Sequence, residues 1–326
     1  MPAMTVVGGL GAVLGVPLVL CGYLLATERL LGRVAPRRRA AVRPWLWLAP
    51  GLTLLAALLV YPALHTVALS FQNASSTRFV GIANYAYLLS NRNVLLALRN
   101  NLLWMVVFTA ATVSLGLLIA VLTDRVRYEA VLQAVIFVPM TISFVAAGVI
   151  WKFMYQYQPA GSPQVGALNA LLTAWAPGFQ PQAWLFNPSL NNWALIAVGI
   201  WMWTGFAMVI CSAALKGIDE TLLEAARIEG ASEAKIFFHI VLPLMRPTVV
   251  VVTTTLVIGV LKVFDIVYVM TNGNLGTDVI ANQMYKEMFN FHDFGRASAI
   301  ATVLLLAILP IMAMNLRRVG GEGGPR

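Results

Sequence analysis

The sequence predicts an all-α fold, a polytopic bundle of transmembrane helices, from three observations. Hydrophobic residues make up 60% of the 326 residues and charged residues only 11%, a composition that would leave large apolar patches exposed on a soluble domain. Apolar runs long enough to cross a hydrocarbon core of about 30 Å, which takes about 20 helical residues, recur along the chain. Lys and Arg gather in short segments between these runs, as expected of connections at a membrane surface.

Seven apolar runs are candidate spans. The first could instead be a secretory signal, but it lacks a basic segment before it and a small-residue cleavage site, so a retained helix is favoured. Its Gly11 and Gly15 form a GxxxG pair that permits close helix approach. We therefore expect about seven spans, an amino-terminal extra helix and six others, at residues 5–25, 45–70, 101–122, 130–154, 193–215, 248–270 and 297–316.

The distribution of Lys and Arg predicts the orientation, because cytoplasmic connections retain basic residues. One set of connections holds 15 of them, and the opposite set, with the adjoining helix ends, holds six. The amino terminus is therefore expected outside and the carboxyl terminus in the cytoplasm. The net charge of +9 does not indicate a nucleic-acid partner, because the basic residues flank apolar runs instead of forming one face of a soluble module. The basic connections are residues 26–44, 123–129, 216–247 and 317–326.

The cytoplasmic connection at 216–247 is long and partly polar, and its residues predict two short helices. Asp219 is suited to cap the first helix, Glu220 to its first turn and Gly230 to its carboxyl end. Ser232 is suited to cap the second helix.

Two prolines, Pro243 and Pro247, are expected to end this second helix before the next span. The first helix and its ends contain four acidic residues and one basic residue, Arg227. This excess of negative charge argues against a helix that lies on anionic lipid and for a protein partner. The acidic residues are Asp219, Glu220, Glu224 and Glu229.

The segment EAARIEGASEAKIFFHIVLP, residues 224–243, resembles the EAA loop of binding-protein-dependent ABC importer permeases. The match covers many positions in 20 residues, and the resemblance is closest from about residue 95 to 317. One departure is Glu229, where the family pattern has Asp. The matching positions are Glu224, Ala225, Ala226, Gly230, Ala231, Phe237, Ile240, Leu242 and Pro243.

This resemblance implies a type I importer in a bacterial or archaeal cytoplasmic membrane. Its partners would be a second permease subunit in a heterodimer, two copies of an ABC ATPase and an external solute-binding protein. The EAA loop would dock in the ATPase, with Glu224 as the residue that forms a salt bridge to it. The other residues assigned to ATPase coupling are Ala225, Ala226, Glu229, Gly230, Ala231, Phe237 and Pro243.

The chain contains no sign of its own energy source or catalytic site. No Lys follows a Gly, so the Gly-Lys-Ser/Thr phosphate loop is missing. We expect a transporter subunit that is no enzyme and binds no cofactor, with ATP and Mg²⁺ used by the partner ATPase. The expected organisation is an amino-terminal helix and linker at 1–44, a first core span and external loop at 45–94, a permease domain at 95–317 containing the EAA loop at 219–247, and a disordered tail at 318–326.

Two charges lie in an otherwise apolar run, and they point to the solute pathway. Lys262 and Asp265 are three residues apart, which places them on one face if the helix is continuous. They either pair with each other to fix helix packing or line a polar path, and both readings stay open. Trp203 and Tyr268 are the aromatic candidates for the same path. Trp201 lies in the same span as Trp203, and for both rings the alternative to stacking on a sugar is the general enrichment of Trp at membrane interfaces.

The segments 261–273, 137–145 and 204–210 resemble the alpha-glucoside branch of carbohydrate permeases, which implies a neutral di- or oligosaccharide as the solute. Two other classes compete with the ABC permease. An ion-coupled secondary transporter would use Lys262 and Asp265 as a relay, but neither inverted repeats nor further embedded charges support it. A membrane scaffold would bind an ATPase and transport nothing.

Overall fold

The computed structural model describes residues 18–32, 35–124, 126–176 and 178–322, and these fall into two compact units, residues 1–66 and 67–326. The described residues form helices joined by loops, so the all-α prediction is confirmed. Most of the predicted first span, with Gly11 and Gly15, lies outside the described residues; residues 18–31 are helical. The first unit also contains α2 (Pro36–Leu55) and a π-helical turn, η1 (Ala56–Val60). α3 (Tyr61–Leu69) completes a candidate span, Arg38–Leu69.

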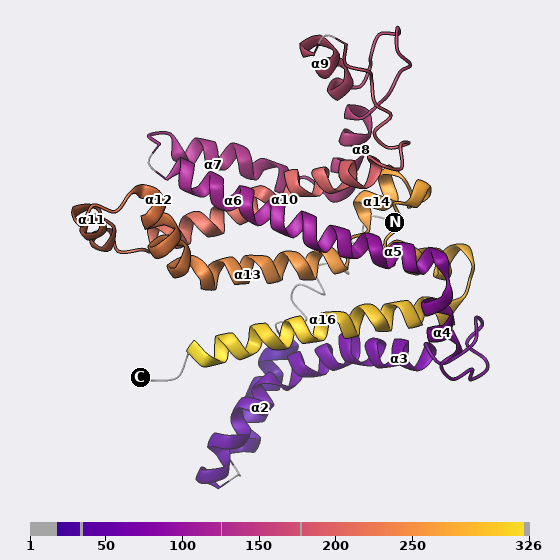
Figure 1. Ribbon diagram of the computed structural model, residues 1–326. Helices are drawn as coiled ribbons and strands as arrows, with labels where there is room; N and C mark the ends of the chain where they lie inside the picture. Colours follow the sequence, from indigo (N-terminus) through magenta and orange to yellow (C-terminus); the bar gives the residue numbers. More distant parts are fainter. Residues whose placement is uncertain (1–17, 33–34, 125, 177, 323–326) are drawn as a thin grey trace, which may run out of the picture. The chain divides into compact units, whose positions relative to one another are not determined.

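The second unit is built around four long helical runs that Figure 1 shows side by side. The first run comprises α5 (Arg92–Leu103), the π-helical turn η2 (Trp104–Phe108) and α6 (Thr109–Thr123). The others are α10 (Asn191–Lys216), α13 (Leu242–Leu261) and α16 (Phe294–Glu322). Five helices of the described chain, counting the span in the first unit, are long and apolar enough to cross a membrane. The number is six if the bent pair of helices at 129–154 is counted as one further span.

Glycines allow α10 to lie close to its neighbours. A Cβ atom on Gly116 of α6 would lie 2.5 Å from the Cβ of Ala207 on α10. A Cβ atom on Gly205 of α10 would lie 2.5 Å from the Ile136 carbonyl oxygen, on the helix that follows α6. Close backbone approach at small residues is the usual way in which helices pack in a membrane. α10 therefore occupies the centre of this unit, and 61% of its most apolar window is buried.

The predicted span at 130–154 is not one continuous helix. It consists of α7 (Glu129–Phe137), the 3-10 turn η3 (Val138–Thr141) and α8 (Phe144–Met154), and the two arms meet at 99°. Pro139 lies in the turn and has no N–H to continue the helical ladder. Ser143 then caps α8 by accepting a hydrogen bond from the Ala146 N–H.

The predicted span at 248–270 is wrong at both ends. Helix runs from Glu233 to Leu261, through α12 (Glu233–Ile236), the π-helical turn η4 (Phe237–Val241) and α13. Pro243 and Pro247 do not end the helix, since Pro243 lies in the first turn of α13 directly after η4, where a proline is tolerated. The run breaks at 262–264, and the short α14 (Asp265–Met270) follows.

Short helices complete the second unit. α4 (Ala83–Ser90) precedes α5, and α9 (Ala167–Trp175) lies in the connection before α10. α11 (Glu220–Ile228) follows α10, and η5 (Asn274–Gly276), α15 (Ile280–Tyr285) and η6 (Lys286–Asn290) join α14 to α16. α16 keeps Pro310 within the helix and reaches Glu322, so the tail predicted from 318 is wrong for 318–322; residues 323–326 lie outside the described chain.

Candidate functional site

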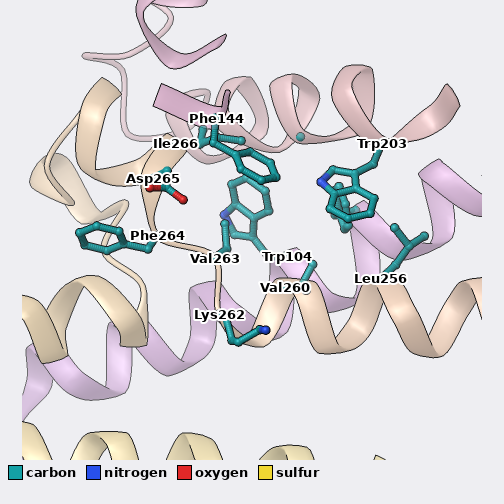
Figure 2. A pocket seen from close by; sticks show the side chains of 13 residues that line it. Trp104, Phe144, Trp203, Leu256, Val260, Lys262, Val263, Phe264, Asp265 and Ile266 are labelled. Atoms are coloured by element: carbon teal, nitrogen blue, oxygen red, sulfur yellow. The ribbon is translucent and has the colours of Figure 1, made fainter. Parts of the chain in front are cut away.

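A cavity of about 280 Å³ lies where α8, α10, α13, α14 and the η2 turn meet (Figure 2). The break between α13 and α14 supplies its two charged groups, and η2 and α10 supply two indoles. Three of the four predicted pathway residues line it, namely Lys262, Asp265 and Trp203. The sequence did not point to the remaining lining residues, among them Trp104, Phe108, Phe144, Leu256 and Phe264.

The two charged residues lie at helix ends and not on one helical face. Lys262 is the C-cap residue of α13 and Asp265 is the first residue of α14, with Phe264 in a non-helical conformation between them. A cation at a helix carboxyl end and an anion at an amino end are each favoured by the helix dipole. The structure contains no ion pair between Lys262 and Asp265, both of which it describes, so of the two readings left open by the sequence it does not contain the internal ion pair, and the expected single helical face is wrong.

Aromatic rings form much of the remaining wall. Trp203 lies against Phe144 with ring centroids 6.3 Å apart, and Figure 2 shows its indole and that of Trp104 at the cavity. Trp104 is 1% exposed, and its indole N–H has no hydrogen-bond partner in the described part of the chain. Trp201 instead packs edge-on against Trp151, with centroids 5.5 Å apart, and does not line the cavity.

Tyr268, the fourth predicted residue, stacks on Phe264 with ring centroids 5.1 Å apart and lines a different cavity. The first cavity therefore combines an ammonium donor, a carboxylate acceptor and two indoles. Pockets of this kind hold ligands through apolar contact and a few placed polar groups. The set suits a ligand with hydroxyl groups and apolar C–H faces, since hydroxyls both donate and accept hydrogen bonds.

The first predicted short helix, α11, begins as the sequence indicates. Asp219 is its N-cap, and its carboxylate accepts hydrogen bonds from the Thr221 hydroxyl at 2.7 Å and the Thr221 N–H at 3.0 Å. These bonds stabilise the ionised carboxylate and lower the pKa of Asp219 below its ordinary value, with the side-chain bond as the larger cause.

The carboxyl end of α11 is a complete Schellman turn. The Ala231 N–H donates to the Ala226 carbonyl, and the Gly230 N–H donates to the Arg227 carbonyl, each at 3.0 Å. Gly230 has a φ of +79°, a left-handed conformation that favours glycine. Across the turn, Arg227 Nε lies 2.7 Å from Glu233 Oε1, a contact that the sequence did not predict and that raises the pKa of Arg227. Ser232 caps α12 as predicted, accepting from the Lys235 N–H.

The α11 helix has one face packed on the chain and one face open. Leu223 and Ala226, like Ala231 and Phe237, pack against a buried cluster that includes Met245. On the open face, Leu222 is 50% and Ile228 is 85% exposed. Of the predicted coupling residues, Ala226, Ala231 and Phe237 are therefore partly buried, and the exposed ones are Glu224, Ala225, Glu229, Gly230 and Pro243.

A polar network that the sequence did not reveal fixes the end of α10 just before α11 begins. Lys216 Nζ lies 2.7 Å from Glu129 Oε1 at the start of α7. Gln133 of α7 donates to the same carboxylate at 2.6 Å and to Ser212 Oγ at 2.9 Å. The residues come from α7 and α10, more than 70 positions apart in the sequence, so no local pattern could have shown the contact. The network ties the bent span to the base of α11.

Comparison with known families and proteins places this geometry in context. Residues 112–319 match the family described as "Binding-protein-dependent transport system inner membrane component". Over 273 residues, the chain is 56% identical to the osmoprotective compounds uptake permease protein GgtC of Synechocystis sp., covering 84% of this chain and 97% of that protein. It is 45% identical over 306 residues to the alpha-glucoside transport system permease protein AglF of Rhizobium meliloti, covering 93% and 90%.

Solved structures share the fold. A chain of a bacterial alginate ABC transporter, in complex with an alginate pentasaccharide-bound periplasmic protein, superposes with a TM-score of 0.72 at 21% identity, covering 83% of this chain and 93% of that chain. A second structure, of a bacterial ABC transporter that imports alginate, gives a TM-score of 0.71 at 24% identity, covering 86% and 99%. At these identities the similarity concerns the fold of the helical bundle alone.

Proposed function

This chain belongs to the family of binding-protein-dependent transport system inner membrane components and is a membrane-embedded permease subunit of a sugar ABC importer, and we propose that its solute is a neutral alpha-glucoside. The proposal rests on one observation above all. The cavity at the α13–α14 break holds a donor, an acceptor and two indoles in a chain 45% identical to an alpha-glucoside permease. The ion-coupled secondary transporter is set aside, because permeases of this family are driven by ATP hydrolysis in separate subunits and not by an ion gradient.

The two relatives suggest related solutes. One is named for alpha-glucosides and the other, at 56% identity, for osmoprotective compounds. Trehalose, a neutral disaccharide of two alpha-linked glucose units, is an osmolyte and therefore meets both descriptions. We expect labelled trehalose, maltose and sucrose to be taken up by vesicles that contain the assembled transporter and its solute-binding protein. Uptake of glycine betaine or an amino acid in their place would overturn the proposal.

The pathway proposal assigns Lys262 and Asp265 to the solute. Neither has a protein partner in the part of the chain that the structure describes, so both are available to bind hydroxyl groups. Asp265→Asn keeps the shape but replaces two acceptors by one acceptor and one donor. We expect at least about a tenfold fall in sugar uptake, because one hydrogen bond to a charged group contributes about 1.5–3 kcal/mol and about 1.4 kcal/mol corresponds to tenfold. Unchanged uptake in Asp265→Asn and Lys262→Gln would remove both residues from the pathway.

The coupling proposal assigns the open face of α11 to a partner ATPase on the cytoplasmic side, with the amino terminus of the chain outside. Support comes from the exposed acids Glu224 and Glu229 beside the exposed Leu222 and Ile228, a combination suited to a protein surface and unsuited to anionic lipid. We further propose two ATPase copies, a second permease subunit and an external solute-binding protein as partners. ATP closure of the ATPases would then displace α11 and the ends of α10 and α12 joined to it.

Charge reversal on this face tests the coupling proposal. Glu224→Arg should leave the subunit inserted and reduce ATP-driven sugar uptake at least about tenfold, equivalent to about 1.4 kcal/mol of docking free energy. The matched control is Glu220→Arg, an exposed acid on the same helix that the EAA pattern does not include. Normal uptake by Glu224→Arg, or an equal loss in the control, would argue against the docking role.

A further inference from the structure

A second cavity, of about 900 Å³, lies between the end of α8, the segment that follows it and the loop after α14. It is larger than the first cavity and near the top of the range of about 300–1,000 Å³ for small-molecule sites. Its wall combines aromatic rings with side-chain amides, and among the described residues Lys152 is the one charged residue that lines it. The rings that line it include Tyr157, Phe186 and Tyr268, and the amides are those of Gln156, Asn272 and Asn274.

The loop that forms one side of this cavity has an unusual backbone. Four residues between α14 and α15 have positive φ: Asn272 at +52°, Gly273 at +71°, Leu275 at +56° and Gly276 at +79°. For Leu275, which carries a Cβ, this conformation costs about 1–2 kcal/mol. Such strain persists only where the surrounding structure holds the backbone in place, and it is frequent at ligand-binding sites.

Four asparagines from α5 and α10, here called the asparagine clamp, hold this loop. Asn100 Nδ2 donates to the Gly276 carbonyl at 2.7 Å and to the Asp278 carbonyl at 2.8 Å. Asn101 Oδ1 accepts from the Ile280 N–H at 2.8 Å. Asn191 Nδ2 donates to the Leu275 carbonyl at 2.9 Å, and Asn192 Nδ2 to the Gly276 carbonyl at 3.3 Å. Because the partners of the clamp are backbone groups, four carbonyl contacts and the Ile280 N–H, the clamp fixes the path of the loop and not its side chains.

A largely buried ion pair completes the support of the loop. Asp278 Oδ2 lies 2.8 Å from Lys286 Nζ, and Asp278 Oδ1 accepts from the Val279 N–H at 3.0 Å and from Asn282 Nδ2 at 2.6 Å. Asn272, Asn274 and Leu275 of the same loop are exposed and line the cavity, whereas Asp278, Val279, Asn282 and Lys286 are not among the described residues that line it. The side-chain amide of Asn274 and that of Gln156, across the cavity wall, have no partner within the described chain.

We propose that this cavity is an outer sugar subsite, which receives one hexose unit of the solute before the solute enters the first cavity. Side-chain amides donate and accept, so they match hydroxyl groups on a rigid ring, and the aromatic rings offer faces for its C–H groups. α14 joins the two cavities, since Asp265 and Ile266 line the first and Tyr268 to Thr271 line the second. This inference rests on the proposed function, because it takes the sugar and the outward orientation from it.

The inference predicts separate effects on sugar capture and on ATP hydrolysis. In proteoliposomes with the full transporter and its solute-binding protein, the double variant Gln156→Ala, Asn274→Ala should lower maltose uptake at least about fivefold, as expected for lost hydrogen bonds to two amides. Binding-protein-stimulated ATP hydrolysis should stay unchanged, because released sugar escapes outward while the ATPase cycle continues. The matched control is Gln180→Ala, an exposed amide in the same connection that does not line the cavity.

Each outcome of this experiment decides the matter. A loss of uptake with normal ATP hydrolysis supports the subsite. Normal uptake in the double variant overturns it, and so does a parallel loss of uptake and ATP hydrolysis, which would assign the surface to docking of the solute-binding protein. If the unmodified transporter imports none of the sugars, the proposed function fails and not the subsite alone.

A direct binding measurement gives a second, independent test. The thiol introduced by Asn274→Cys, in a Cys21→Ser background, is labelled with a membrane-impermeant thiosulfonate on the assembled transporter without ATP. Maltose at a concentration that fills two thirds of the sites should slow labelling about threefold, and glycine betaine should not. Equal labelling rates with and without maltose, up to the highest soluble concentration, would overturn the subsite.

Discussion

The loop between α14 and α15 and the α11 segment are both short, polar connections, yet they are held in opposite ways. Both contain glycines at positive φ, Gly273 and Gly276 in the loop and Gly230 after α11. The loop depends on side chains from α5 and α10, which lie far from it in the sequence. In the α11 segment, the free backbone N–H and C=O groups at the helix ends form hydrogen bonds within the segment, to Asp219 and in the Schellman turn. One connection is therefore fixed by the bundle, and the other is a preformed unit that leaves a face free.

This difference determines how each connection responds to substitution. A buried polar group that loses its partner costs about 1–3 kcal/mol, whereas an exposed hydrogen bond or ion pair contributes about 0–1 kcal/mol. Changes in the asparagine clamp should therefore destabilise the bundle itself. Changes in α11 should leave the bundle intact and act on the connection to the ATPase. The following variants test this contrast, beginning with the one of largest expected effect.

Asn100→Leu should have the largest effect. Asn100 is 3% exposed, and its loss removes the 2.8 Å donor of the Asp278 carbonyl and leaves the Gly276 carbonyl with the longer 3.3 Å bond from Asn192. We expect the purified complex to lose about 2–4 kcal/mol of stability, seen as a lower midpoint of thermal unfolding and as protease cleavage within 271–279. Asn93→Leu, at an exposed position of the same helix, is the control and should behave as the unmodified protein. An unchanged midpoint in Asn100→Leu would show that the clamp does not hold the loop.

Gly230→Ala should have a smaller and local effect. A residue with a Cβ at a φ of +79° costs about 1 kcal/mol, and the cost falls on the turn after α11. Hydrogen exchange should become faster in α11 and α12, with no change in the thermal midpoint of the bundle. The control is Gly217→Ala at the end of α10, where φ is −81° and an added Cβ meets no atom closer than 3.4 Å. A lower bundle midpoint in Gly230→Ala would contradict the independence of α11.

The charge on Asp219 gives a pH-dependent version of the same test. Its pKa is lowered in the folded chain by the Thr221 hydrogen bonds, so its stabilising contribution is present above the ordinary pKa of 3.8 and is lost as pH falls through the lowered value. Exchange of the α11 amides, corrected for intrinsic rates, should therefore show constant protection between about pH 5 and 8 and a loss only below about pH 4. Asp219→Asn keeps a neutral cap and should remove this pH dependence. A decline that begins near neutral pH would assign it to another group.

The same contrast explains which features the sequence could predict. The cap at Asp219, the turn at Gly230 and the cap at Ser232 were predicted because each depends on neighbours within a few residues. The clamp was not, since Asn100 and its acceptor Gly276 are 176 positions apart. The break at 262–264 was missed because apolar residues lie on both sides of Lys262 and Asp265, and hydropathy alone does not show where a helix ends. The helix end predicted at Pro243 was wrong, because the π-helical turn before this proline lets the helix continue through it.

Two ion pairs with nearly equal distances provide the most discriminating comparison. Arg227–Glu233 beside α11 measures 2.7 Å with side chains 30% and 70% exposed, and Lys286–Asp278 beneath the loop measures 2.8 Å with side chains 18% and 13% exposed. Solvent screens the first pair, so Arg227→Gln should leave the thermal midpoint within error. Lys286→Gln should lower it, because Asp278 would keep a buried charge without its cation. Equal shifts in the two variants would show that burial does not distinguish the two connections, and the contrast between a bundle-held loop and a self-contained α11 would fail.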